Sequence, residues 1–125
     1  MKTDKTDKME KSAFVRVFGD TPVVRVIDFL LAERGLYDFT LTDIAENSEV
    51  SWSTLHVIFP QLIKLGLVKQ TRAIARAKLY ELNQENELAK KLIKTRNEIS
   101  DYFIEQELKN QGHVHKHVVP VAARR

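Results

Sequence analysis

Residues 40–82 read TLTDIAENSEVSWSTLHVIFPQLIKLGLVKQTRAIARAKLYEL, and the order of polar and apolar residues in this stretch decides the fold. Thr40 stands three residues before Asp43, a spacing that predicts a capping box at the start of a short helix. The polar run 47–49 ends that helix, and Val50 is the single apolar residue of the turn that follows. Ser51 starts a second helix, which Gly66 ends. The stretch therefore predicts two helices joined by a tight turn.

The residues after Gly66 predict a β-hairpin. Segments 67–72 and 77–82 read as strands, with Val68, Tyr80 and Leu82 at the inward positions. The connection 73–76 lacks the Gly or Asn that a two-residue turn favours, so we expect a longer or irregular loop. Two helices joined by a tight turn have helix-turn-helix geometry, in which the second helix fits the major groove of DNA. A hairpin that directly follows this second helix is a wing.

With these residues the chain resembles the winged helix-turn-helix transcriptional regulators of bacteria and archaea, in particular the small archaeal ones. The resemblance extends over residues 21–82 and is carried by the segments 42–46, 50–55, 62–68 and 77–80. It implies a mainly α fold with a small β-hairpin wing, to which this chain adds a long C-terminal dimerisation helix. In such proteins a short extended segment, here 37–39, pairs with the wing strands.

Composition divides the chain into four parts. We expect a disordered N-terminal tail at 1–12, because it is charged and almost free of apolar residues. The winged helix-turn-helix domain then occupies 13–83, with a helical turn that Gly19 stops and a longer helix that starts at Thr21-Pro22. A long helix follows at 84–111, and a flexible basic tail at 112–125 begins where Gly112 ends it. The residues expected in the core are Val23, Ile27, Leu30, Leu31, Ile44, Leu55, Phe59, Leu62, Leu65, Val68 and Tyr80.

The long helix is the predicted dimerisation element. No Gly or Pro interrupts it, and about 27 residues would be about 40 Å long, well beyond the reach of so small a domain. Nothing in the sequence is left to cover its distal half, so we expect the same helix of a second subunit to do so in a two-fold dimer. The alternative is a helix that folds back on its own domain. The predicted seam includes Leu88, Leu92, Ile99, Tyr102 and Phe103.

The resemblance also implies which residues contact double-stranded DNA. Helix 51–65 would insert its outward side into the major groove, where Gln61 can pair with adenine and serine hydroxyls can donate to phosphates. Wing cations would hold the flanking backbone. The predicted DNA-binding residues are Thr42, Ser51, Trp52, Ser53, Thr54, His56, Val57, Gln61, Lys69, Arg72, Arg76 and Lys78.

Two departures from this pattern keep other functions open. The first half of the second helix has no Arg or Lys, the residues that make the commonest specific base contact. Pro60 lies inside the helix, which predicts a kink or a short break near Phe59. Besides a dimeric, sequence-specific regulator, the alternatives are a module that binds another protein through Trp52 and Val57, and a nonspecific DNA-organising protein of chromosome or plasmid.

Charge and composition limit the function classes further. The net charge is +3, but residues 67–83 carry four basic side chains against one acidic, whereas residues 21–47 carry two against five. The absence of cysteine fits a cytoplasmic protein, and no apolar run has the length of a membrane span. We see no arrangement typical of an enzyme and no cofactor motif. His113, His115 and His117 alternate in the tail without a supporting carboxylate, so we predict no metal site there.

Overall fold

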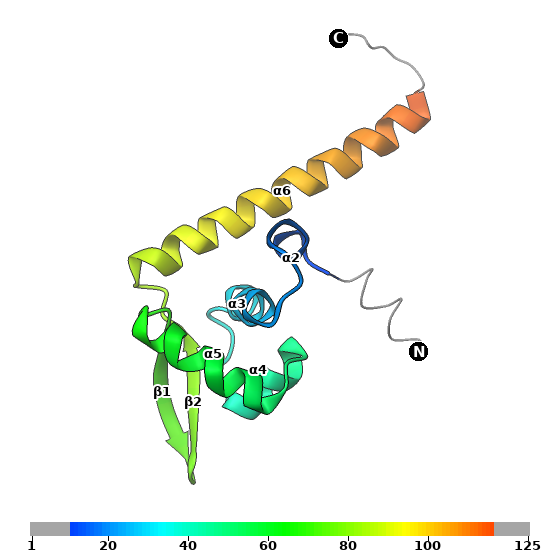
Figure 1. The fold of residues 1–125 in the computed structure, drawn as a ribbon. Helices are drawn as coiled ribbons and strands as arrows, with labels where there is room; N and C mark the ends of the chain where they lie inside the picture. Colours follow the sequence, from blue (N-terminus) through cyan, green and yellow to red (C-terminus); the bar gives the residue numbers. More distant parts are fainter. Residues whose placement is uncertain (1–10, 117–125) are drawn as a thin grey trace.

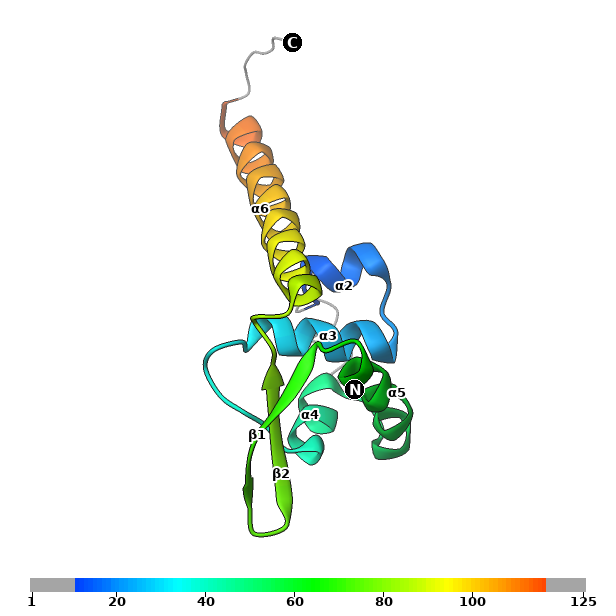
Figure 2. The same cartoon turned by 90° about the vertical axis from the view of Figure 1, so that its left-hand side faces the viewer.

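The computed structural model describes residues 11–116, with side chains as far as residue 111. Its elements follow the order α2 (Ala13–Phe18), α3 (Pro22–Ala32), α4 (Leu41–Ser48), α5 (Trp52–Lys64), β1 (Val68–Ile74), β2 (Ala77–Leu82) and α6 (Glu87–Lys116). Helices α3, α4 and α5 form the body, the β1–β2 hairpin extends from one end, and α6 leaves the other end with α2 beside it (Figures 1 and 2). The predicted mainly α chain with one hairpin and a long last helix is confirmed.

The helix starts follow the predicted capping rules. The Asp43 N–H donates to Thr40 Oγ1 at 3.1 Å and the Thr40 N–H donates to Asp43 Oδ2 at 3.2 Å, which completes the capping box. Thr21 caps α3 just before Pro22. At α2 the N-cap is Ser12, a residue assigned to the disordered tail, so the tail prediction is wrong for residues 11 and 12. Residues 1–10 lie outside the part that the structure describes.

The core combines predicted and unexpected residues. Val26, Leu31, Ile44 and Leu55 are its largest fully buried side chains. Val23 and Leu65 are exposed instead, because one lies in the first turn of α3 on the solvent side and the other is the C-cap of α5. The core cluster also contains Leu82, which was predicted at an inward position, and four residues that the expected core list lacks, namely Phe14, Val26, Leu67 and Ala89.

Helix α5 runs without interruption through Pro60, so of the expected kink or short break near Phe59 the break is wrong. Pro60 is on the exposed side, and the flanking Phe59 and Leu62 are buried in the core. Burial of these two side chains outweighs the single backbone hydrogen bond that the proline removes. At the helix end Gly66 has a φ of 77°, and a Cβ on it would lie 2.6 Å from Asn86 Nδ2.

The hairpin has a tighter tip than its sequence suggests. Ile74 pairs with Ala77, so the connection is the two residues 75 and 76, and the predicted longer loop is wrong. Ala75 takes the left-handed conformation, with a φ of 56°, that a glycine or asparagine usually supplies. The predicted contact of segment 37–39 is confirmed: Phe39 pairs with Tyr80, with N–H···O distances of 2.8 and 2.7 Å.

Helix α6 ends later than the sequence predicts. It continues through Gly112 to Lys116, so the expected stop is wrong, and the backbone at positions 113 and 115 is helical rather than extended. The side chains of His113, His115 and His117 lie outside the described residues.

Helix α2 covers part of the predicted dimer seam. Leu92 and Ile99 pack against the chain's own core, and the Arg16 guanidinium lies 4.7 Å from the centre of the Phe103 ring. The expectation that nothing in the chain covers the distal half of the long helix is therefore wrong at Ile99 and Phe103. Leu88 and Tyr102 are exposed, as are Ile104 and Leu108 farther along. Within residues 11–116, no helix combines the length and the apolarity of a membrane span.

Candidate functional site

The outward side of α5 is exposed, as the sequence predicts. Ser51, the N-cap, is exposed, and so are the predicted contact residues Trp52, Ser53, His56, Val57 and Gln61. Trp52 is 50% exposed and Val57 71% exposed, which is high for large apolar side chains. On the opposite side Leu55, Phe59 and Leu62 are buried. The core thus fixes the helix from one side and leaves the other free for a partner.

Hydroxyl groups fix the start of α5. The Thr54 N–H donates to Ser51 Oγ at 3.1 Å, and Ser51 Oγ donates in turn to Thr54 Oγ1 at 2.8 Å. Ser53 Oγ lies 3.4 Å from Ser51 Oγ. Thr54 is only partly exposed, and its hydroxyl is engaged in the cap. Of the predicted hydroxyl contacts on α5, Ser53 is therefore the one that is exposed and does not itself cap the helix.

One turn of α5 presents an aromatic pair. The rings of Trp52 and His56 meet edge to face, with their centroids 4.3 Å apart. This contact orients Trp52 across the start of the helix. It thereby joins two predicted contact residues into one small surface.

A groove lies between the hairpin and the starts of α4 and α5. It has a volume of about 350 Å³ and is lined by Thr40, Leu41, Thr42, Trp52, Arg76, Ala77, Lys78 and Tyr80. Four predicted contact residues thus meet here from three elements: Thr42 from α4, Trp52 from α5, and Arg76 and Lys78 from the hairpin. Gln61 and Lys69 are not among the lining residues.

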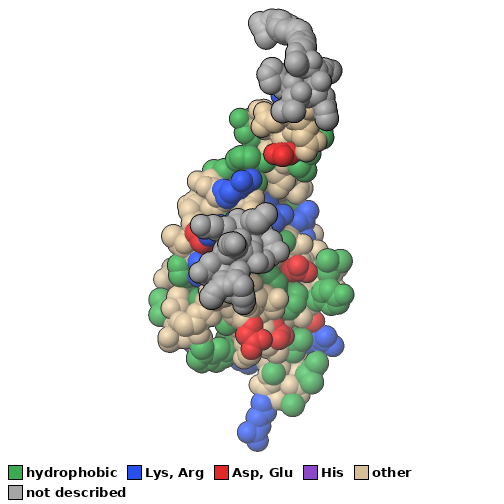
Figure 3. Space-filling model, turned by 90° about the vertical axis from the view of Figure 1, so that its right-hand side faces the viewer, with side chains coloured by type: hydrophobic (Ala, Val, Ile, Leu, Met, Phe, Trp, Pro, Cys, Tyr) green, Lys and Arg blue, Asp and Glu red, His purple; other side chains and the backbone are tan. Residues whose placement is uncertain are grey.

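The four basic residues of the hairpin fall into two pairs. Lys69 Nζ lies 3.8 Å from Glu81 Oε2, and Arg72 is held by Asp38. Arg76 and Lys78 form no ion pair with any residue between 11 and 111. In the view of Figure 3, basic side chains mark the far end of the hairpin and hydrophobic side chains are scattered along α6. The predicted cluster of four accessible cations is therefore a paired root and an unpaired tip.

Asp38 makes the strongest polar contact near the groove. Arg72 donates to it with both sides of its guanidinium, Nε to Oδ2 at 2.8 Å and Nη2 to Oδ1 at 2.9 Å. The Thr71 hydroxyl donates to Oδ2 at 2.5 Å. These hydrogen bonds, first from Arg72 and then from Thr71, hold the pKa of Asp38 well below its ordinary value of 3.8. Because the folded pKa is lowered, the interaction is fully present above pH 3.8 and is lost only as the pH falls through the lowered pKa.

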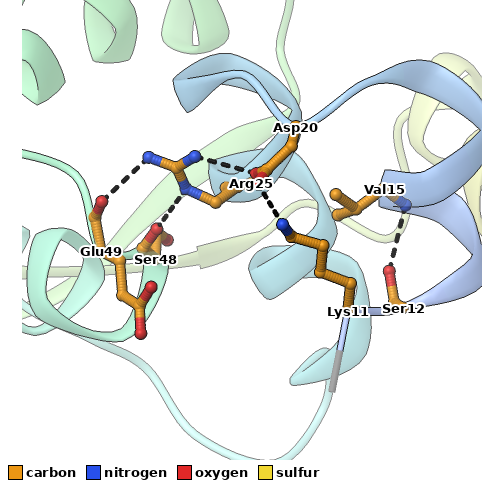
Figure 4. Close-up of polar contacts among 7 residues, drawn as sticks. All are labelled: Lys11, Ser12, Val15, Asp20, Arg25, Ser48 and Glu49. Atoms are coloured by element: carbon orange, nitrogen blue, oxygen red, sulfur yellow. Dashed lines mark hydrogen bonds and ion pairs between the residues drawn. The ribbon is translucent and has the colours of Figure 1, made fainter. Parts of the chain in front are cut away.

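Arg25 is a second residue that sequence reasoning missed. Its guanidinium donates to the backbone carbonyls of Ser48 and Glu49, each at 2.9 Å, where α4 turns toward α5. It also contacts Asp20 at 2.9 Å, and Asp20 in turn accepts from Lys11 at 2.7 Å (Figure 4). The hydrogen bonds from Lys11 and Arg25 lower the pKa of Asp20. Arg25 thus satisfies two carbonyls at the end of α4 and fixes the turn before α5.

These two missed residues left different signals in the sequence. Asp38 is an acidic residue in the segment predicted to pair with the basic hairpin, so a salt bridge to that hairpin was open to prediction. The carbonyl groups that Arg25 binds are 23 and 24 positions away in the sequence. No local pattern indicates that contact. Among residues 11–111 no three His, Asp or Glu side chains gather in a way that could hold a metal ion.

Comparison of the chain with protein-family models, with curated proteins and with solved structures finds no match.

Proposed function

We propose that the protein is a winged helix-turn-helix regulator of transcription that binds specific double-stranded DNA sequences as a dimer in the cytoplasm. In this proposal α4 and α5 are the helix-turn-helix, α5 enters the major groove, and the β1–β2 hairpin is the wing. The observation that carries the proposal is the groove between the hairpin and the starts of α4 and α5. It joins the exposed start of α5 to the two unpaired cations of the hairpin tip.

The chemistry of this surface suits a duplex. Ser53 and Gln61 are exposed hydrogen-bonding side chains on the outward side of α5, where base edges would lie. Arg76 and Lys78 lie on the hairpin near Trp52, at the start of that helix. With α5 in the major groove of DNA, the phosphate backbone beside the major groove would lie next to these two cations. Thr42, exposed near the start of α4, supplies a further hydroxyl for phosphate.

The dimer is proposed to form through α6. The exposed residues Leu88, Tyr102, Ile104 and Leu108 leave apolar surface along this helix that a second copy could cover. A two-fold dimer would place two copies of α5 at half-sites about one DNA turn apart. Sedimentation of the full chain tests this step. A monomer at all concentrations, with or without DNA, would leave the binding proposal standing but remove the dimer.

The single tryptophan of the chain makes the binding test direct. Trp52 is the only tryptophan and lines the groove, so its fluorescence reports occupancy of the proposed interface. We expect duplexes selected from a genomic pool by the purified protein to change this emission saturably, with an affinity that falls as salt rises. Scrambled duplexes of equal length are the control. No change at low salt with any duplex would refute the proposal, and equal binding of selected and scrambled duplexes would favour a nonspecific organiser.

One observation favours a second candidate, a module that binds another protein. The outward side of α5 exposes Trp52 and Val57, and α5 has one basic residue, Lys64, at its end. Exposed apolar side chains of this size are typical of protein interfaces. If a protein partner shifts the Trp52 emission in the same preparation that ignores every duplex, this second function replaces the first.

A further inference from the structure

The hairpin has little packing of its own beyond its root. Every residue from Lys69 to Lys78 is exposed, and in β2 only Leu79 and Leu82 are buried. A two-stranded ribbon without packing is marginally stable in water. The orientation of the hairpin tip must therefore come from whatever ties its middle to the body.

Two neighbouring residues of the segment before α4 make the polar ties, beside the edge-to-face contact of the Tyr80 ring with Phe59 of α5, whose centroids are 4.9 Å apart. Phe39 pairs with Tyr80 of β2 through two backbone hydrogen bonds of 2.8 and 2.7 Å. Asp38, the residue before it, binds the side chains of Thr71 and Arg72 on β1. One short segment thus holds both strands at about the same level of the hairpin.

An irregularity in the hairpin makes the second tie possible. The register shifts between Gln70 and Arg72, so Thr71 has no paired residue on β2. Its hydroxyl contacts Asp38 and the Leu79 carbonyl, at 2.5 and 3.3 Å. The bulge therefore brings two consecutive side chains, those of Thr71 and Arg72, to one carboxylate.

The edge of the Arg72 guanidinium formed by Nε and Nη2 is occupied by Asp38. The Arg72 side chain is 58% exposed, but its Nε and Nη2 groups both donate to Asp38. The Asp38 side chain is only 15% exposed. Taking the guanidinium away would leave that poorly hydrated carboxylate without its charged partner. Arg76 and Lys78 have no such competitor among the described residues.

We propose that Asp38 is a positioning residue: with Thr71 and Arg72 it forms a brace that sets the angle at which Arg76 and Lys78 face a DNA backbone. Arg72 acts within this brace and does not contact phosphate, contrary to its assignment from the sequence. This inference rests on the proposed DNA-binding function. It divides these hairpin cations by role: Arg72 for orientation, and Arg76 and Lys78 for contact at the tip.

The decisive variant is Arg72→Lys, because it keeps the charge but cannot bridge both carboxylate oxygens. Through the brace, it weakens binding of a selected duplex about fivefold, close to the effect of Arg72→Ala. The slope of log affinity against log salt stays at the wild-type value in the charge-neutral double variant Asp38→Ala/Arg72→Ala, and Arg76→Ala reduces it by about 0.9. Wild-type affinity in Arg72→Lys, or an unchanged affinity in the double variant, overturns the proposal.

A measurement without DNA separates this inference from the proposed function. Amide hydrogen exchange of residues 73–78 should accelerate in the double variant, whereas exchange in α5 should stay as in the wild type. If the wild-type chain binds no duplex but the hairpin amides respond, the proposed function fails and the brace stands. If duplexes bind and the hairpin amides do not respond, the brace fails and the function stands.

Discussion

Helix α5 and the β1–β2 hairpin border the same groove, but different interactions hold them in place. The helix is fixed by its inner side, where Leu55, Phe59 and Leu62 are buried, and by the Ser51 cap at its start. The hairpin is exposed from Lys69 to Lys78 and is tied to the body by backbone pairing at Phe39 and by polar contacts to Asp38.

The hairpin, which is the less buried of the two elements, carries more positive charge than α5. The 13 residues of α5 include one cation, Lys64, whereas the hairpin carries four. The rigid element thus offers hydrogen bonds and apolar surface, and the loosely anchored element offers charge. Outward substitutions on α5 should therefore alter chemistry without altering position, whereas substitutions on the hairpin can alter both. Four variants test this difference, in order of decreasing effect.

Leu55→Ala removes a buried side chain that packs the inner side of α5 against the core. Leu55 is 0% exposed, and loss of a fully buried leucine side chain should lower the free energy of unfolding by about 2–5 kcal/mol. Urea denaturation measures the loss. Val57→Ala, on the exposed side of the same helix, is the control and should change stability by no more than about 0.5 kcal/mol. Equal effects at the two positions would mean that the inner and outer sides are assigned incorrectly.

Gln61→Ala tests the outward chemistry of α5. If Gln61 reads an adenine, the variant should lose about 1–3 kcal/mol of discrimination at one base pair while keeping its thermal stability. Competition among duplexes that differ at single positions measures this change. The matched control is Lys64→Ala, which should weaken all duplexes alike. A uniform loss in Gln61→Ala would remove it from the reading side.

Neutralising the hairpin tip tests the contribution of charge. Arg76→Ala/Lys78→Ala should weaken binding of every duplex on the order of tenfold at low salt and reduce the salt slope by about 1.8, because two phosphate contacts disappear. A salt titration of Trp52 fluorescence measures both quantities. Lys69→Ala, whose ammonium group faces Glu81, is the control and should change the slope less. A sequence-dependent loss would indicate base contacts by the tip.

Thr40→Ala should have the smallest effect of the four variants. Removal of the capping hydroxyl should cost about 1 kcal/mol, measurable as a lowered midpoint of thermal unfolding. Thr42→Ala, two residues later and exposed, should leave the midpoint unchanged and weaken DNA binding instead. The reverse result would exchange the structural and binding roles of these two threonines.

Local rules account for the parts of this fold that could be predicted from sequence. The capping box at Thr40, the start at Thr21-Pro22 and the hairpin strands depend on residues within a few positions of one another. The resemblance implied which α5 residues face outward, and helical periodicity is consistent with that assignment. These features need no knowledge of the remaining chain.

The features that sequence reasoning missed depend on contacts between distant positions. Asp38 and Arg72 are 34 residues apart, so the predicted pairing of segment 37–39 indicates a salt bridge to the hairpin, but no spacing rule identifies Arg72 as the partner. Cover of Ile99 and Phe103 by α2 depends on how a six-residue helix docks against one of thirty. Gly112 failed as a stop signal because a glycine inside a helix costs only about 0.5–1 kcal/mol relative to alanine.

Ala75 has a consequence for how this hairpin could change. A left-handed conformation costs an ordinary L-residue about 1–2 kcal/mol, a cost that glycine does not bear. The backbone conformation of Ala75 is therefore maintained by the pairing of the two strands, which begins at Ile74 and Ala77, and not by the conformational preference of alanine. Substitutions that loosen the strands would reach the tip first, and the cations there would lose their alignment before the rest of the molecule unfolds.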